Sequence, residues 1–174
     1  PGGDLQGVCY YRYLGDYLAT RKKAEAGKSA VIIGGGFIGS ELAASLTANK
    51  VKVTMLFPEP YLARRVFPED LGRAIQHQFI DKGIRVITGD LPASIDIEGD
   101  TFVTSTRNGH ELRSDILIVG IGIAPAVGLA RQAGLEIDNG IVVDEYQQSS
   151  DPVIFAAGDN ANFPYLALGR RTRV

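Results

Sequence analysis

Two hydrophobic patterns alternate along the first half of the chain. Short, continuous apolar runs at 30–33, 51–56 and 84–87 are typical of strands buried on both faces of a parallel sheet. Between these runs, apolar residues recur at helical spacing over 37–49 and 68–82. This alternation of strand and helix predicts an α/β fold with a parallel sheet.

A further helix is expected before the first strand, over 13–26. Leu14 and Leu18 share an apolar stripe there, and the run Arg21-Lys22-Lys23 would form its solvated face. The helix that begins at 68 has a proline at its first position, where the missing N–H group costs least.

The pattern changes over 93–113. Short alternating runs are separated by the polar sequence at 98–100 and by Asn108-Gly109, which is a type I′ hairpin signal. We therefore expect an antiparallel meander inserted into the parallel fold. The remaining expected elements are a buried parallel strand at 115–119, a helix over 127–133, and strands at 141–143 and 153–156.

The strand at 30–33 runs into a glycine turn, and the next helix begins directly after it. Gly34, Gly36 and Gly39 spell Gly-x-Gly-x-x-Gly, which between a buried strand and a helix is typical of dinucleotide binding. Gly34 would permit a tight turn, and Gly36 would allow a pyrophosphate to approach the backbone closely. Gly39 would allow the helix to pack closely on the strand. The free N–H groups of the helix would bind the anion. A structural turn without a ligand is the alternative.

The choice between NAD and NADP depends on the residues after the second strand. Dinucleotide folds place an acidic residue there, about 20 residues after the glycine turn, to hold the adenine ribose. Phe57 stands at that position and Glu59 follows it. A carboxylate would repel a 2′-phosphate and favour NAD, whereas Arg64 and Arg65 could bind that phosphate. We favour NAD, and NADP stays open.

Composition narrows the function classes. The chain has 174 residues, enough for one domain with a core, and a formal net charge of −2. A nearly neutral chain argues against nucleic acid and against an anionic membrane surface, and no apolar run suggests a membrane span. Cys9 is the single cysteine, so we expect a small buried residue and neither an internal disulfide nor a metal site. The expected location is cytoplasmic.

Four segments, in order, resemble one family. They are "VIIGGGFIGSELA", "LFPE", "VGIGIAP" and "IFAAGDNANF". They are similar to the pyridine nucleotide-disulfide oxidoreductase superfamily of FAD- and NAD(P)H-binding flavoproteins, in the branch of apoptosis-inducing factor and the ferredoxin reductases. The resemblance implies a Rossmann-like parallel sheet with an inserted antiparallel meander, with NAD(H) and FAD as cofactors.

In this family the NADH-binding domain is inserted into the FAD-binding domain. The resemblance thus implies a lead-in segment and helix at 1–28, an NAD(H)-binding domain at 29–150, and the start of the returning FAD segment at 151–174. Both ends of the chain look cut, so we expect a piece of a longer polypeptide. The Gly-Asp motif that contacts the flavin nucleotide matches Gly158-Asp159.

The resemblance also assigns roles to individual residues. Phe37 would pack against the nicotinamide or its ribose, Glu41 would contact the nicotinamide amide, and Glu59 would take the adenine ribose. The alternatives are helix-start packing for Phe37 and a favourable helix dipole for Glu41. The expected cofactor-binding residues are Gly34, Gly35, Gly36, Phe37, Ile38, Gly39, Glu41, Glu59, Gly120, Ile121, Gly122, Gly158 and Asp159.

Besides Phe57, which replaces the commoner acid, the chain departs from the family pattern at two further points. Ala124 stands where many relatives have a glutamate before the proline of "VGIGIAP". No pair of cysteines is present, so the disulfide chemistry in the superfamily's name does not apply to this stretch.

The function implied is hydride transfer from NADH to FAD, with electrons passed on to an acceptor such as a ferredoxin. No catalytic side chain is expected in this part. The implied partners are NADH, the FAD-binding domain of the same polypeptide, a ferredoxin-type acceptor and a second copy of the chain. One alternative is a flavoprotein in which NADH controls association rather than fast turnover. A third interpretation places FAD on the glycine turn.

Overall fold

The structure is a computed structural model that describes residues 1–173. The chain forms two compact units, of which unit 1 is Pro1–Gly122 and unit 2 begins at Ile123. The boundary expected after residue 150 lies inside unit 2, and the functional division of the chain stays a prediction.

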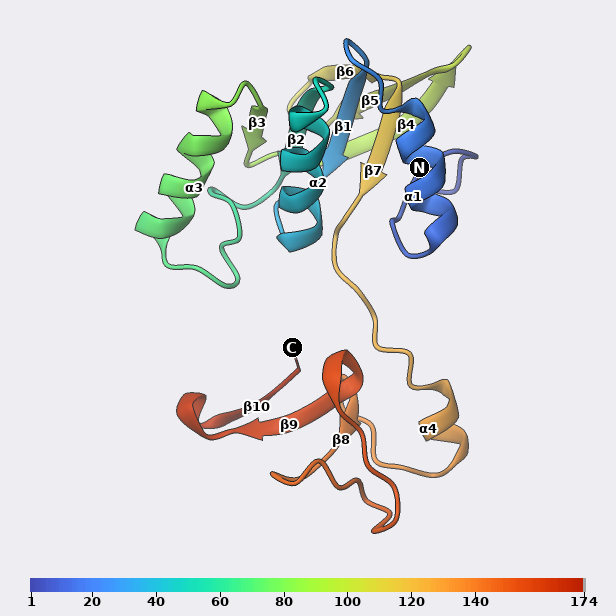
Figure 1. Ribbon diagram of the computed structural model, residues 1–174, viewed down its shortest axis with the longest axis vertical. Coiled ribbons are helices and arrows are strands. Elements are labelled where there is room, and N and C mark those ends of the chain that lie inside the picture. Colours follow the sequence, from blue (N-terminus) through green and yellow to red (C-terminus); the bar gives the residue numbers. More distant parts are fainter. Residues whose placement is uncertain (174) are drawn as a thin grey trace. The chain divides into compact units, whose positions relative to one another are not determined.

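The centre of unit 1 is a parallel sheet with strand order β3-β2-β1-β7 (Figure 1). Ile33, at the end of β1, pairs with Leu56 of β2 on one side and with Val119 of β7 on the other, so these strands end at one edge. The bounds are Ser29–Ile33 for β1, Lys52–Phe57 for β2, Arg85–Thr88 for β3 and Ile116–Val119 for β7. The predicted parallel α/β fold is confirmed.

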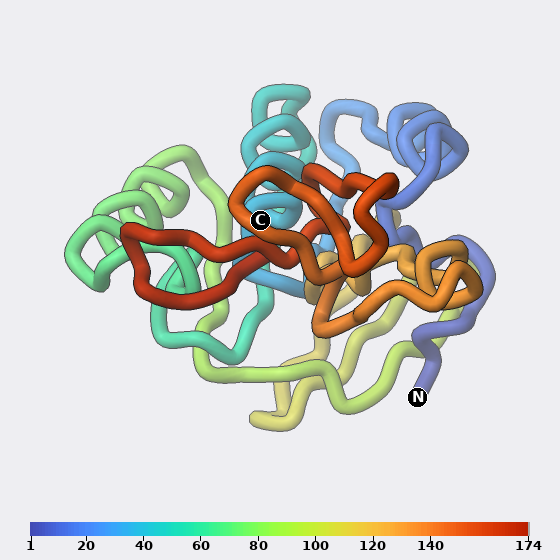
Figure 2. Tube along the Cα trace, turned by 90° about the horizontal axis from the view of Figure 1, so that it is seen from below, coloured from blue at the N-terminus to red at the C-terminus, as the bar shows by residue number. Residues whose placement is uncertain are grey.

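Different layers cover the two faces of this sheet. Helices α1 (Leu14–Lys23), α2 (Phe37–Ala48) and α3 (Glu69–Asp81) lie along one face (Figure 2). An antiparallel sheet of order β4-β5-β6 covers the other, which confirms the predicted meander. Its strands are β4 (Pro92–Glu98), β5 (Thr101–Thr106) and β6 (Glu111–Ser114).

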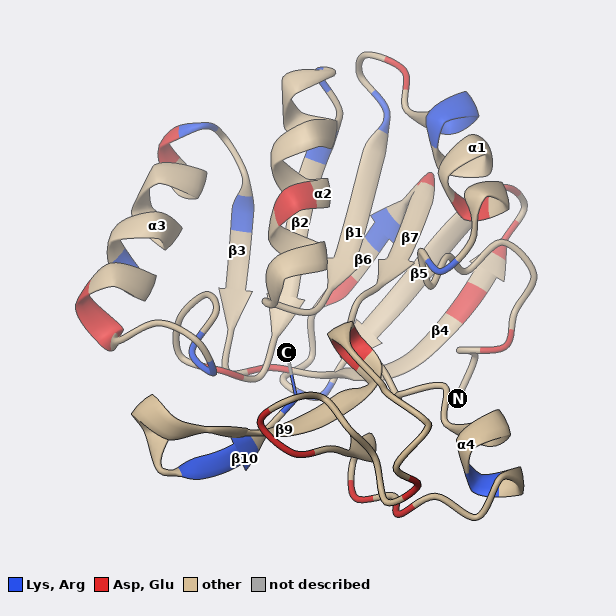
Figure 3. Cartoon of the chain, turned by 60° about the horizontal axis from the view of Figure 1, so that its bottom comes forward, with Lys and Arg blue, Asp and Glu red and all other residues tan. Residues whose placement is uncertain are grey.

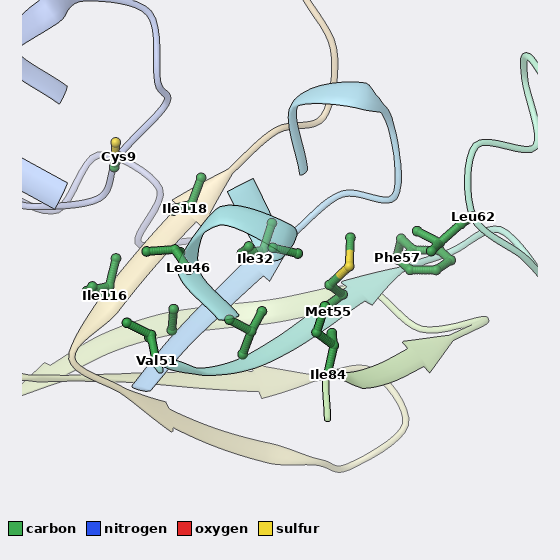
Figure 4. Close-up of a cluster of buried hydrophobic side chains, with 13 residues drawn as sticks. Cys9, Ile32, Leu46, Val51, Met55, Phe57, Leu62, Ile84, Ile116 and Ile118 are labelled. Carbon is green, nitrogen blue, oxygen red and sulfur yellow. The ribbon is translucent and has the colours of Figure 1, made fainter. Parts of the chain in front are cut away.

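Each strand contributes side chains to two cores, which explains its continuous apolar run. On the helix side, Ile32 and Met55 are fully buried beside Leu46 of α2 (Figure 4). On the meander side, Leu117 and Leu56 pack with residues such as Phe102. Strands β1 and β7 carry no charged residue (Figure 3). Because the strands are packed on both faces, they are held firmly in the sheet, and so are the loops that begin at its carboxyl edge.

The segment before α1 extends the sheet by one bridge. Cys9 donates its N–H group to the carbonyl of Leu117 at 3.0 Å and accepts from the N–H group of Val119 at 2.8 Å. Its side chain is 8% exposed, so the expectation of a small buried residue is confirmed. The stripe expected on α1 is wrong, because Leu14 and Leu18 are 71% and 55% exposed.

The turn between β5 and β6 differs from the expectation. A type I′ turn needs positive φ at both central residues, but of Asn108 and Gly109 only Gly109 has one, at 85°. The N–H group of Gly109 bonds to the carbonyl of Thr106 at 3.2 Å. The turn is therefore a type I turn followed by a left-handed glycine.

Unit 2 contains a small sheet of order β10-β9-β8. The strand expected at 153–156 is wrong, because Phe155 forms only an isolated bridge with Gln148 and is 61% exposed. The central strand of this sheet is instead β9, at Ala161–Tyr165. Sequence reasoning missed it because Pro164 interrupts its apolar pattern. The elements are α4 (Gly128–Gln132), β8 (Ile141–Val142), the 3-10 turns η1 (Gly158–Asn160) and η2 (Leu166–Leu168), β9 (Ala161–Tyr165) and β10 (Arg170–Thr172).

The carboxylate of Asp115 links the amino ends of β1 and β7 through hydrogen bonds. Asp115 accepts from the hydroxyl of Ser29 at 2.7 Å, from the N–H group of Ser29 at 2.8 Å and from the ammonium of Lys28 at 3.0 Å. These bonds, the Ser29 hydroxyl first among them, lower the pKa of Asp115 to about 2.

We expect Asp115→Asn to lower the free energy of unfolding by about 1 kcal/mol at pH 7, since the site is one-third exposed and partly screened. The folded pKa lies below the unfolded value, so this stability is present above about pH 4 and lost as pH falls to about 2. Urea unfolding at pH 7 and near pH 2 measures it. An equal difference between parent and variant at both pH values would contradict the assignment. Asp100→Asn, an exposed change, is the control.

Candidate functional site

A pocket of about 410 Å³ lies at the carboxyl edge of the parallel sheet in unit 1. It is formed where the chain leaves β1, β2, β3 and β7, the place where open α/β sheets bind ligands. It is lined by Ile33, Gly34, Gly35, Gly36, Phe37, Pro58, Glu59, Ala63, Arg64, Arg65, Val66, Leu91, Gly120, Ile121 and Gly122. The structure thus brings together eight of the thirteen residues expected to bind cofactors.

Packing within the chain accounts for three glycines of the turn. A Cβ atom on Gly34 would lie 2.2 Å from the carbonyl oxygen of Gly120, and one on Gly39 would lie 2.3 Å from that of Gly34. A Cβ atom on Gly35 would lie 2.7 Å from the ring of Phe57. Each contact is shorter than a side chain tolerates, so the fold itself requires these glycines.

Gly36 is the glycine that the fold does not explain. A Cβ atom there would have nothing within 4 Å, and its φ of −86° suits any residue. It is exposed, lines the pocket and is the N-cap of α2. No side chain caps this helix, and its first turn holds no acidic residue. Its N–H groups therefore present a partial positive charge at the pocket, as a helix that binds an anion does.

Backbone hydrogen bonds hold the turn in place. Gly34 donates its N–H group to the carbonyl of Leu56 at 2.8 Å. Ala63 donates to the carbonyl of Gly35, also at 2.8 Å, and takes a φ of 53° to do so. The loop after β2 is thereby fastened across the glycine turn, and it supplies one wall of the pocket.

Charged side chains of both signs lie in this loop. The carboxylate of Glu59 is 3.7 Å from the guanidinium of Arg65, and their side chains are 23% and 82% exposed. Arg64 lines the same pocket. Phe57, at the position where an acid was expected, is buried under Gly35, so the nearest carboxylate is two residues farther on.

The other expected residues lie elsewhere. Gly39 is buried beneath the turn, and Ile38 and Glu41 are exposed on α2 without lining the pocket. Phe37, by contrast, does line the pocket; it is 55% exposed and contacts the ring of Phe67 edge to face, with centroids 6.1 Å apart. In unit 2, Gly158 begins η1 with a φ of 77°, and Asp159 follows it. Their roles in binding stay predictions.

Sequence reasoning missed five lining residues: Ile33, Pro58, Ala63, Val66 and Leu91. Ile33 is the last residue of β1, and the other four belong to loops. A position directly after a parallel strand was the one available signal, and it applies to Pro58 after β2 and roughly to Leu91 after β3. Within residues 1–173, no group of three or more His, Cys, Asp or Glu side chains could hold a metal ion. In the same range, no helix has the length and apolar character to cross a membrane.

Comparison with known protein families and with individual proteins points to the same class of protein. A family profile described as pyridine nucleotide-disulphide oxidoreductase matches residues 1–172. The chain is 38% identical, over 178 residues and 99% of its length, to monodehydroascorbate reductase 4, peroxisomal, of Arabidopsis thaliana, and covers 36% of that protein.

Solved structures show the same likeness. The structure resembles the covalent complex of putidaredoxin reductase with putidaredoxin, with a TM-score of 0.91, 33% identity, and coverage of 99% of this chain and 42% of that one. It also resembles water-forming NADH oxidase from Lactobacillus brevis bound to NADH, with a TM-score of 0.89, 26% identity, and coverage of 100% and 39%. The chain thus spans about two fifths of the length of these proteins.

The glycine turn allows a matched pair of variants. We expect Gly39→Ala to lower the free energy of unfolding by about 2 kcal/mol, because its Cβ atom meets a backbone oxygen that cannot yield. We expect Gly36→Ala to change it by less than about 0.5 kcal/mol. Denaturant unfolding of both variants measures this, and equal losses would show that Gly36 is also required by the fold.

Proposed function

Because this chain belongs to the pyridine nucleotide-disulphide oxidoreductase family, we propose that it binds NADH at its glycine turn as part of an FAD-dependent oxidoreductase. One observation carries the proposal. Gly36 has open space where a Cβ atom would stand, at the uncapped start of α2 and in the pocket. A glycine that the fold does not need fits close approach by a pyrophosphate. The relative that was solved with NADH supports the ligand.

The order of the strands suggests how the dinucleotide lies. Gly34–Gly36 follow β1, in the middle of the sheet, and would hold the pyrophosphate. Glu59 follows β2 and would hold the adenine ribose on one side. Gly120–Gly122 follow β7, on the opposite side of β1, and would border the nicotinamide. The nicotinamide would then lie near Phe37, at the start of α2.

The chemistry belongs to the cofactors. In the intact protein, bound FAD would supply the acceptor for a hydride from NADH. The residues of this chain bind and orient NADH, and none of them acts as an acid or base in this proposal. We infer that the FAD-binding part resumes at Ile123, since 123–150 fold together with the Gly-Asp motif at 158–159. The positive φ of Gly158 and the open space beside it fit close approach of a flavin nucleotide to the backbone.

We further propose a one-electron acceptor for the intact protein. The relative solved with putidaredoxin supports a ferredoxin-type partner. The plant relative's name supports a small organic radical of the monodehydroascorbate type. The alternative in which NADH controls association gains no specific support from these relatives. The cytoplasm remains the predicted location.

Titration of the purified chain with NADH, followed by nicotinamide fluorescence, tests the proposal, and the absence of Trp keeps the protein background low. We expect saturable binding, weakened at least about tenfold in Gly36→Ala because its methyl group would occupy the place of the pyrophosphate. Unchanged thermal unfolding of that variant is the control. Binding that is absent from the parent, or equal in the variant, would contradict the proposal.

The same titration with NADPH separates the charged residues. We expect NADH to be preferred and Glu59→Gln to reduce the preference about fivefold or more, since the carboxylate accepts bonds from the ribose and repels a 2′-phosphate. Arg65→Gln should leave NADH affinity nearly unchanged. A parent that prefers NADPH, and loses the preference in Arg65→Gln, would move the assignment to the guanidinium groups.

A further inference from the structure

Asp90 is a buried ionisable residue with no role in the binding described so far. It is 3% exposed and lies between the end of β3 and the start of β4. The residue after it, Leu91, lines the pocket. Because β3 lies beyond β2 in the sheet, Leu91 is on the side of the pocket that would hold the adenosine.

Hydrogen bonds join this crossover, Gly89–Leu91, to the turn between β5 and β6. Oδ1 of Asp90 accepts from the N–H group of Leu91 at 2.8 Å and from that of Asn108 at 3.1 Å. Arg107 donates its N–H group to the carbonyl of Leu91 at 2.9 Å. The side chain of Asn108 donates to the carbonyl of Gly89 at 3.3 Å. Both side-chain and backbone hydrogen bonds thus attach the crossover to the meander.

The environment keeps Asp90 ionised although it is buried. Burial raises the pKa of Asp90, but the Thr106 hydroxyl, two backbone N–H groups and His110 outweigh it, so the net pKa is lowered. Oδ2 has no hydrogen-bond partner among residues 1–173, so Oδ1 carries the hydrogen bonds that hold the crossover. A charged acceptor makes stronger hydrogen bonds than a neutral one, which suits a residue that fixes a turn.

We propose that Asp90 is a positioning residue for the nucleotide pocket, which holds Leu91 against the adenosine half of the ligand by tying the crossover to the meander turn. The proposal rests on the NADH binding proposed above. In this proposal the meander contributes to binding indirectly, because among residues 89–114 only Leu91 lines the pocket. Asp90 acts through Leu91 and does not itself contact the ligand.

The test is a double-mutant cycle on the same chain, with NADH fluorescence and competition by ADP-ribose as readouts. We expect Asp90→Ala to weaken NADH and ADP-ribose by the same factor, about fivefold, because the adenosine wall is displaced. Asp90→Asn should stay within about twofold of the parent, since its amide oxygen can accept the same two N–H groups. Asp96→Ala, an exposed acid in β4, is the matched control and should bind like the parent.

The cycle is closed with Leu91→Ala. If Asp90 acts through Leu91, the double variant binds no more weakly than Leu91→Ala alone. Fully additive losses, or an Asp90→Ala variant that is folded and binds like the parent, would overturn the proposal. If Asp90→Ala does not fold, Asn108→Ala replaces it in the cycle, with an expected loss of about twofold. A parent that binds neither NADH nor ADP-ribose would instead refute the proposed function.

Discussion

The site depends on the close approach of backbone to backbone at the carboxyl edge of the sheet. Gly34 lies against the carbonyl of Gly120, and Gly39 lies against the carbonyl of Gly34. Side chains at Gly34 and Gly39 would separate β1 from the residues after β7 and α2 from β1. The direction of α2, and with it the direction of its free N–H groups, follows from these two contacts. A helix start aimed at the pocket is thus a consequence of packing within the chain.

The close packing at the glycine turn also determines which residue can stand at the end of β2. Because Gly35 has no side chain, the ring of Phe57 can lie directly beneath it and fill the space under the turn. A carboxylate in that buried place would need partners that this core does not provide. The acidic residue therefore stands two positions later, on a loop that Ala63 fastens to Gly35. Phe57 thus fills the space under the turn, and the carboxylate that lines the pocket is that of Glu59.

The predictable part of the structure is the part with a clear pattern in the sequence. Apolar runs at 30–33 and 51–56 identified strands buried on both faces, and the glycine spacing identified the turn. The roles of the glycines were less predictable, because spacing alone does not show that Gly35 lies on Phe57 or that Gly36 faces open space. Leu91 has no motif, and it reaches the pocket through the position of β3 in the sheet.

The error at the turn between β5 and β6 has a physical origin, since a local signal competes there with longer-range contacts. Asn108-Gly109 would favour a type I′ turn in an isolated hairpin. Here the N–H groups of Arg107 and Asn108 are used by Leu91 and Asp90, which belong to a segment about sixteen residues earlier. A turn whose donors are engaged outside the hairpin takes the geometry that those bonds require. In this protein the turn is therefore better understood as a support for the neighbouring crossover than as the end of a free hairpin.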